Sequence, residues 1–135
     1  MRPSKSNFDA MKKEAVFQWV KETYGIEPDY PWIDDDSAVL RHKDNRKWFG
    51  LVMHIASDKL GLRSTKSVDV LNVKCDPLLI PALHQERGIF PAYHMNKTNW
   101  ISILLDGSVK AADVKALMDM SYELTKKKVK NRGNE

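Results

Sequence analysis

The stretch 68-VDVLNVKCDP-77 contains the clearest change of local structure in the chain. Its first eight residues alternate strictly, so that Leu71, Val73 and Cys75 share one side. A period of two is typical of a β-strand whose two faces meet different surroundings. Asp76-Pro77 then supplies an N-cap and a proline for the first turn of a helix. The stretch therefore predicts a strand followed directly by a helix.

Upstream of this stretch, the sequence predicts one helix and a pair of strands. The helix is expected from about residue 7 to residue 24, because apolar residues recur at helical spacing and Gly25 supplies a stop. Two strand-like runs, 37–42 and 48–56, are joined by a polar hairpin connection at 43–47. The expected N-cap of the helix and its apolar stripe are Ser6, then Phe8, Met11, Ala15 and Trp19, widened by Val16 and Val20.

Downstream, the sequence predicts a short helix, a second hairpin and a final helix. Pro81 lies one turn into the first of these helices, so we expect that helix to be short or kinked. Strands are expected at 90–95 and 100–105, around a turn at 96–99. Ser108 is expected to cap a helix that reaches about residue 128. The apolar stripe expected on that helix is Ala112, Ala116, Leu117, Met120 and Leu124.

The order of the expected elements is α-β-β-β-α-β-β-α. Short connections between consecutive strands predict a mostly antiparallel sheet of about five strands with helices packed on one face, an α+β fold. No proline- or glycine-rich linker divides the chain, so we expect residues 1–135 to form a single domain. The basic segment 126–135 is interpreted either as a solvated, frayed helix end or as a phosphate-binding tail.

The composition indicates a globular protein of the cytoplasm. Apolar residues make up 42% of the chain and charged residues 30%, and the formal net charge is +4. No apolar run approaches the roughly 18 residues that a membrane span needs, and the N-terminus lacks the apolar core of a secretory signal. The single cysteine, Cys75, fits a reducing compartment. The mild positive charge admits nucleic acid as a partner without requiring it.

Four motifs together resemble the MmcQ/YjbR family of small bacterial proteins. They are, in order along the chain, 71-LNVKCDP-77, 93-YHMNKTNW-100, 105-LDGS-108 and 119-DMSYEL-124. The resemblance implies an antiparallel sheet with flanking helices, similar to the "double wing" of a phage DNA-binding domain. It also implies a DNA-binding role, although a shared fold does not establish a function.

The reactive residues favour structural roles over catalysis. Cys75 and His94 could form a nucleophile–base pair across neighbouring strands. Cys75, however, is in phase with Leu71 and Val73, which favours a small core residue. No segment resembles a nucleophile elbow or a phosphate-binding glycine loop. We therefore expect a protein that is not an enzyme.

Metal-binding patterns are equally weak. The histidines (His42, His54, His84 and His94) are scattered without ligand spacing. The acidic run 34–36 lacks further spaced oxygen ligands. Frataxin-like iron proteins have a similarly ordered fold but an acidic first helix, whereas lysines alternate with acidic residues in the first helix here. We expect no metal and no cofactor.

Basic and polar residues gather at the two predicted hairpins. The residues expected to contact double-stranded DNA are Arg41, Lys43, Arg46 and Lys47 on the first hairpin, and His94, Asn96 and Lys97 on the second. Such cations can dock on phosphates, while Asn96 or His94 can reach base edges. Hairpin tips are also polar simply because they are solvated. The alternative is a small-molecule- or protein-binding module that uses the sheet face as a pocket.

Overall fold

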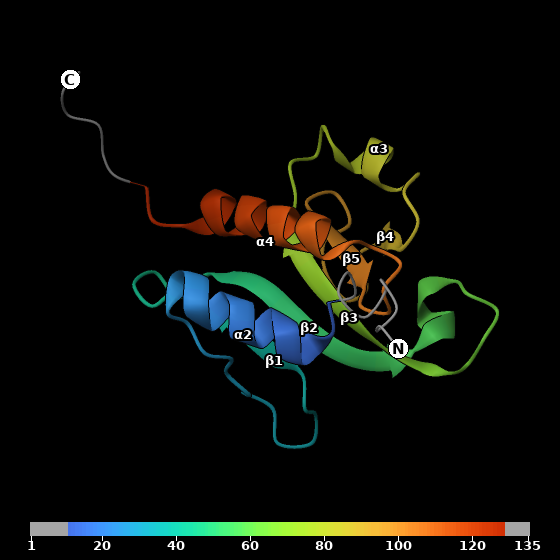
Figure 1. Ribbon diagram of the computed structural model, residues 1–135, viewed down its shortest axis with the longest axis horizontal. Helices are drawn as coiled ribbons and strands as arrows, with labels where there is room; N and C mark the ends of the chain where they lie inside the picture. Colours follow the sequence, from blue (N-terminus) through green and yellow to red (C-terminus); the bar gives the residue numbers. More distant parts are fainter. Residues whose placement is uncertain (1–10, 129–135) are drawn as a thin grey trace, which may run out of the picture.

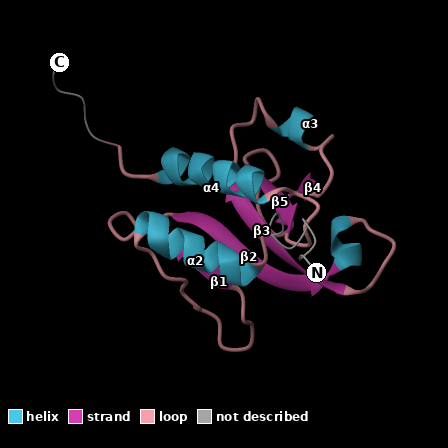
Figure 2. Cartoon of the chain, in the orientation of Figure 1, coloured by secondary structure: helices cyan, strands magenta, loops and turns pink. Residues whose placement is uncertain are grey.

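The computed structural model describes residues 11–128 and contains a five-stranded antiparallel sheet with helices against one face (Figures 1 and 2). The predicted fold class and element order are confirmed. The elements are α2 (Lys13–Tyr24), β1 (Ala38–Arg41), β2 (Trp48–Ala56), the 3₁₀ helix η1 (Ser57–Leu60), β3 (Ser67–Lys74), α3 (Ile80–Leu83), β4 (Ile89–Pro91), β5 (Trp100–Leu104) and α4 (Ala111–Thr125). No helix within residues 11–128 is long and apolar enough to cross a membrane.

The strand order is β1-β2-β3-β5-β4, so β5 lies between two strands that precede it in the sequence. Each neighbouring pair is antiparallel, as in Leu71 opposite Ile103 and Ile89 opposite Ile103. The short strand β4 forms one edge and ends at Pro91. Proline suits an edge strand because it has no N–H to donate to a further strand.

The main core lies between the sheet and two helices, α2 and α4, which cover the same face (Figure 1). Val16 and Val20 of α2 and Val114 and Met118 of α4 are almost fully buried there. Ser121 fixes α4 to the strands, since its hydroxyl donates to the Phe49 carbonyl at 2.7 Å and accepts from the Lys74 N–H at 2.9 Å. A buried hydroxyl with both partners satisfied positions the helix as well as an apolar contact would.

The buried stripe of α4 differs from the predicted one. Of the predicted positions only Leu117 is buried, whereas Ala112, Ala116 and Leu124 are exposed. The observed stripe is Val114, Leu117, Met118, Ser121 and Thr125. The predicted stripe is rotated around the helix axis relative to the observed one, because the prediction counted only apolar residues. Two hydroxyl residues, Ser121 and Thr125, belong to the buried side. In α2, Ala15 is exposed whereas the predicted Val16 and Val20 are buried; Ser6 and Phe8 lie outside the described residues.

Two predicted helix caps also need correction. Ser108 does not begin α4: its N–H and hydroxyl both donate to Asp106, and Lys110 occupies the N-cap position. Asp76 accepts the Leu78 N–H at 2.9 Å and so closes a turn that precedes α3. The predicted shortness of that helix is confirmed, because α3 has only four residues with Pro81 as its second.

The opposite face of the sheet carries a second apolar cluster that loops cover. Its buried members are Val39, Leu51, Met53, Val70 and Leu104. Side chains from outside the sheet pack against them, including Leu60 of η1 and Tyr93 and Met95 of the connection between β4 and β5. This face is therefore only partly closed, in contrast to the helix-covered face.

Candidate nucleic-acid interface

The two polar connections predicted to contact DNA leave the same end of the sheet. The connection between β1 and β2 covers 42–47, and the one between β4 and β5 covers 92–99. Because every strand pair is antiparallel, β1, β3 and β4 end where β2 and β5 begin. Three interstrand spacings of about 4.8 Å place the connections roughly 15 Å apart, close to the width of a DNA groove.

The 42–47 connection is held against the C-terminal end of α4 by two hydrogen bonds. The His42 Nε2 lies 2.9 Å from the Thr125 Oγ1, and the Asn45 Nδ2 donates to the Thr125 carbonyl at 3.0 Å. The Thr125 hydroxyl in turn donates to the Ser121 carbonyl at 2.8 Å. Its proton is thereby used, so His42 acts as the donor. Sequence reasoning did not find this link, because the partners lie 83 residues apart.

His42 is a structural residue with a perturbed pKa. Its ring is buried between Phe49 and Tyr122, with centroid separations of 5.0 and 4.4 Å. Burial lowers the pKa of His42, because the charged form loses its hydration; Asp44 and Glu123 oppose this effect. The imidazole is therefore held neutral inside the joint between the turn and α4.

This joint brings two basic segments together (Figure 1). Lys43, Arg46 and Lys47 are exposed on the turn, and residues 126–128, all lysine, follow α4 directly. Lys126 forms an ion pair with Glu123 at 2.6 Å, which raises its pKa. Only the first three residues of the predicted basic tail are within the described part of the chain. The cations outnumber the nearby carboxylates, so the surface suits a polyanion.

Arg41 occupies a different position from the other predicted DNA contacts. Its Nη2 lies 2.7 Å from the Asp29 Oδ2, and its guanidinium carbon lies 5.8 Å from the centre of the Trp48 ring. Its side chain is only 20% exposed. The structure thus gives Arg41 the role of holding the 26–37 loop beside β1. The sequence offered no signal for this ion pair.

The 92–99 connection folds back over the loop-covered face of the sheet. Asn72 and Ser102 face each other on β3 and β5 and are fully buried. The Ser102 hydroxyl donates to the Asn72 Oδ1 at 2.5 Å, the Asn72 Nδ2 donates to the Tyr93 carbonyl at 2.7 Å, and the Tyr93 N–H donates to the Ser102 Oγ at 3.0 Å. These three bonds form a closed ring that holds Tyr93.

This ring explains why the predicted strand at 90–95 was too long. β4 ends at Pro91, and from there the Tyr93 backbone bonds with side chains of the sheet instead of a neighbouring strand. The expectation of a tight turn at 96–99 holds, since the Asn96 Oδ1 accepts the Thr98 N–H at 2.7 Å. The Asn96 side chain is thereby used within its own turn.

The remaining residues of this connection are exposed. His94 has a positive φ of 65°, rare for a non-glycine residue, and its ring lies 4.0 Å from that of Tyr93. It is close enough to Asp35 to help lower the pKa of that carboxyl group, mainly set by hydrogen bonds from Ser37. Lys97 is exposed at the tip. The loop therefore contributes one lysine to the basic end of the sheet.

Other reactive residues lie away from this end or beneath it. Cys75 is buried in the helix-side core, where burial raises the pKa of its thiol. His94 lies beyond Tyr93, which packs on the opposite face, so the two do not form a nucleophile–base pair. Within residues 11–128, no group of three or more histidine, cysteine or acidic side chains is arranged to hold a metal ion.

Comparisons with known proteins show that this fold is shared. The chain is 42% identical over 117 residues to the protein YyaQ of Bacillus subtilis (strain 168), covering 86% of this chain and 99% of that protein. A crystal structure of a Pseudomonas syringae protein superposes with a TM-score of 0.84 at 40% identity, covering 86% of this chain and all of the other. One from Deinococcus radiodurans, at 23% identity, shows the same fold with a TM-score of 0.67, covering 92% of this chain and 85% of the other.

A family model supplies the assignment that the four sequence motifs suggested. It matches residues 21–124, which include every strand of the sheet, both polar connections and nearly all of α4. The match therefore extends over most of the chain and ends just before Thr125 and the lysines that follow α4. The protein belongs to the YjbR family.

Proposed function

We propose that the protein is a non-enzymatic binding protein whose partner is double-stranded DNA, docked at the basic end of the sheet. One observation carries the proposal: hydrogen bonds from His42 and Asn45 to Thr125 place the basic turn beside the lysines that follow α4. Two segments about 80 residues apart thus contribute cations to one surface, at a joint held by two hydrogen bonds. Such a surface suits the regular phosphate array of a duplex.

The proposed contacts differ in part from the set predicted from sequence. Lys43, Arg46 and Lys47 neutralise phosphates on one side, together with Lys127 and Lys128, and Lys97 reaches a second phosphate run. Arg41 and Asn96 act indirectly, because their side chains already have partners within the protein. His94 is the exposed side chain placed to approach a base edge or sugar. Most of the binding is then independent of DNA sequence.

A salt titration with charge-reversal variants tests this proposal. Binding to a fluorescent duplex is measured by anisotropy for the wild type and for the triple variant Lys43→Glu/Lys47→Glu/Lys97→Glu. Each lost phosphate contact should reduce the slope of log K against log salt by about 0.9. We expect the triple variant to lose most of its affinity at low salt.

A matched control separates local contacts from net charge. The variant Lys59→Glu/Lys66→Glu/Lys115→Glu changes the formal charge equally at exposed positions outside the basic end. It should retain most of the affinity and of the salt slope. Absence of wild-type binding at low salt, or equal losses in the two triple variants, would reject the proposed surface.

A further inference from the structure

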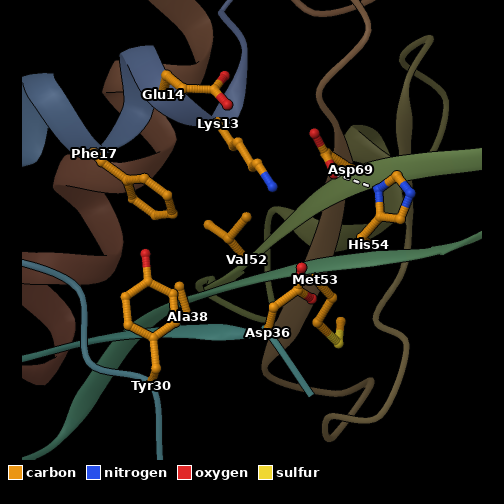
Figure 3. A pocket seen from close by; sticks show the side chains of 10 residues that line it. All are labelled: Lys13, Glu14, Phe17, Tyr30, Asp36, Ala38, Val52, Met53, His54 and Asp69. Carbon is orange, nitrogen blue, oxygen red and sulfur yellow. Dashed lines mark hydrogen bonds and ion pairs between the residues drawn. The ribbon is translucent and has the colours of Figure 1, made fainter. Parts of the chain in front are cut away.

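A hollow of about 400 Å³ lies between the start of α2 and the end of the sheet opposite the basic connections (Figure 3). α2, the 26–37 loop and strands β1, β2 and β3 all contribute side chains to it. Its volume lies within the range of small-molecule sites in proteins. It belongs to neither polar connection, so the proposed DNA surface does not explain it.

The base of the hollow is apolar. Ala38 and Val52 are paired on neighbouring strands and almost fully buried, and the half-buried ring of Phe17 faces them from α2. Figure 3 shows Val52 at the centre of the group, with Phe17 on the helix side. An aliphatic or aromatic body would therefore bury apolar surface on entering the hollow.

A preorganised polar pair forms one wall. His54 and Asp69 are register partners on β2 and β3, and the His54 Nδ1 lies 2.7 Å from the Asp69 Oδ1. Both side chains line the hollow, and they are 50% and 25% exposed. Asp69 orients the imidazole, which leaves the His54 Nε2 available for a further hydrogen bond. Sequence reasoning missed this pair, because the register of the two strands was not known.

One lysine, Lys13, and three carboxylates, those of Glu14, Asp36 and Asp69, line the hollow. Lys13 extends from α2 with its ammonium group directed toward Asp69 and Val52, while Asp36 lies on the 26–37 loop (Figure 3). Lys13 is half-buried, and within residues 11–128 no acidic group lies within 4.0 Å of its ammonium. An ammonium that has no ion-pair partner among the described residues is suited to bind a carboxylate.

We propose that this hollow binds a small zwitterion with an apolar body, such as a free amino acid with a large apolar side chain. Lys13 binds the carboxylate, Asp36 binds the ammonium, and the apolar body rests against Phe17 and Val52. The His54–Asp69 pair forms the polar wall and donates or accepts one further hydrogen bond. A binding site of this kind is separate from the DNA surface and does not depend on it.

Titrations followed by ¹⁵N–¹H NMR spectra test the site with defined probes. L-leucine, L-phenylalanine and L-tryptophan are each added up to about 10 mM, which detects dissociation constants in the millimolar range. At least one should give saturable shifts confined to amides around residues 13, 36, 54 and 69. Absence of saturable shifts for all three probes overturns the proposal.

Two analogues and matched variants test which charges are recognised. For the zwitterion that binds best, the amide removes the carboxylate and the deaminated acid removes the ammonium; each should bind at least about tenfold more weakly. Lys13→Met and Asp36→Asn should weaken binding of the zwitterion similarly. Lys115→Met, at an exposed position of α4, should leave binding unchanged. Thermal unfolding of each variant verifies that it is folded. Equal binding of the zwitterion and both analogues, or equal binding by Lys13→Met and Lys115→Met, overturns the proposed recognition.

Discussion

The two polar connections at the basic end of the sheet are both held by buried side chains, but in opposite ways. The 42–47 turn is held from outside by α4, through His42 and Thr125. The 92–99 loop is held from below by the sheet, through the ring of Asn72, Ser102 and Tyr93. The first arrangement leaves the cations of the turn exposed, while the second draws the loop across the sheet face.

This difference shows how two segments of similar composition, 42–47 and 92–99, come to have different structural roles. Both segments combine Asn, Lys and His, and composition alone does not separate them. In the turn, the buried His42 and the half-buried Asn45 make the hydrogen bonds to α4, and Lys43, Arg46 and Lys47 stay exposed. In the loop, backbone groups provide the anchor and Asn96 closes its own turn. We infer that the 42–47 turn supplies most of the positive charge for DNA binding, whereas the 92–99 loop contributes mainly to the shape of the binding surface.

The largest effect is expected from breaking the ring beneath the loop. Asn72→Leu leaves the Tyr93 carbonyl without its donor and the buried Ser102 hydroxyl without an acceptor for its proton, although Ser102 still accepts from the Tyr93 N–H. Unsatisfied buried polar groups cost about 1–3 kcal/mol each, so we expect a loss of about 3 kcal/mol in the free energy of unfolding. Urea denaturation measures this loss. A change below about 1 kcal/mol would show that the ring does not hold the loop.

Asn96→Ala provides the control for that experiment. Asn96 lies in the same loop, but its hydrogen bond to the Thr98 N–H is exposed to solvent. Water replaces the lost acceptor, so we expect a loss of about 0.5 kcal/mol. A loss equal to that of Asn72→Leu would mean that the whole loop, rather than the buried ring, determines stability.

A smaller loss is expected at the joint between the turn and α4. Thr125→Val preserves shape but removes the hydroxyl that accepts from His42 and donates to the Ser121 carbonyl. We expect the free energy of unfolding to fall by about 2 kcal/mol, because the His42 N–H stays buried without an acceptor. DNA affinity should fall as well, since the turn loses its position. Unchanged amide exchange of residues 42–47 would contradict this role.

The same joint predicts a pH dependence. Burial lowers the pKa of folded His42 below the 6.5 of a free histidine, so the unfolded chain binds a proton more readily than the folded protein does. The contribution of neutral His42 to the free energy of unfolding is therefore fully present above about pH 6.5, and it declines as the pH falls toward the folded-state pKa. The slope from one group is at most about 1.4 kcal/mol per pH unit. His42→Phe should reduce the slope of unfolding free energy against pH in this window.

A small effect, similar to that of Asn96→Ala, is expected at Arg41. Its ion pair with Asp29 is partly exposed, and such pairs contribute about 0.5 kcal/mol. Arg41→Gln should lower stability by about that amount and change DNA affinity less than twofold. Lys47→Gln on the adjoining turn should instead reduce the salt slope of binding by about 0.9. If Arg41→Gln affects the salt slope as strongly as Lys47→Gln does, Arg41 contacts DNA directly.

The sequence predicted the elements well because their signals are local. Alternation at 68–75, the proline in α3 and the polar run 43–47 each act within a few residues. The phase of α4 could not be found in this way, because Ser121 and Thr125 are buried through partners on β2, β3 and the turn. The position of β5 between β3 and β4 likewise depends on contacts across the sheet.

The candidate interface was predictable as a list of cations but not as a surface. That both connections leave one end follows from strand directions, which require the full strand order. The partner of Arg41 and the approach of residues 126–128 to the turn depend on long-range contacts. The His54–Asp69 pair requires knowledge of register, since a shift of one residue would place the two side chains on opposite faces.

β5 is synthesised after β3 and β4, the two strands between which it lies in the sheet. This order has a consequence for folding on the ribosome. Until β5 has been synthesised, β3 presents an unpaired edge and β4 has no strand to join. α4 is also missing then, so the face that carries Leu71 and Phe49 stays open. Nascent chains of this protein thus expose an apolar strand edge, the form most prone to pair with another chain. The order of strands therefore makes the growing chain more vulnerable to aggregation than the finished protein.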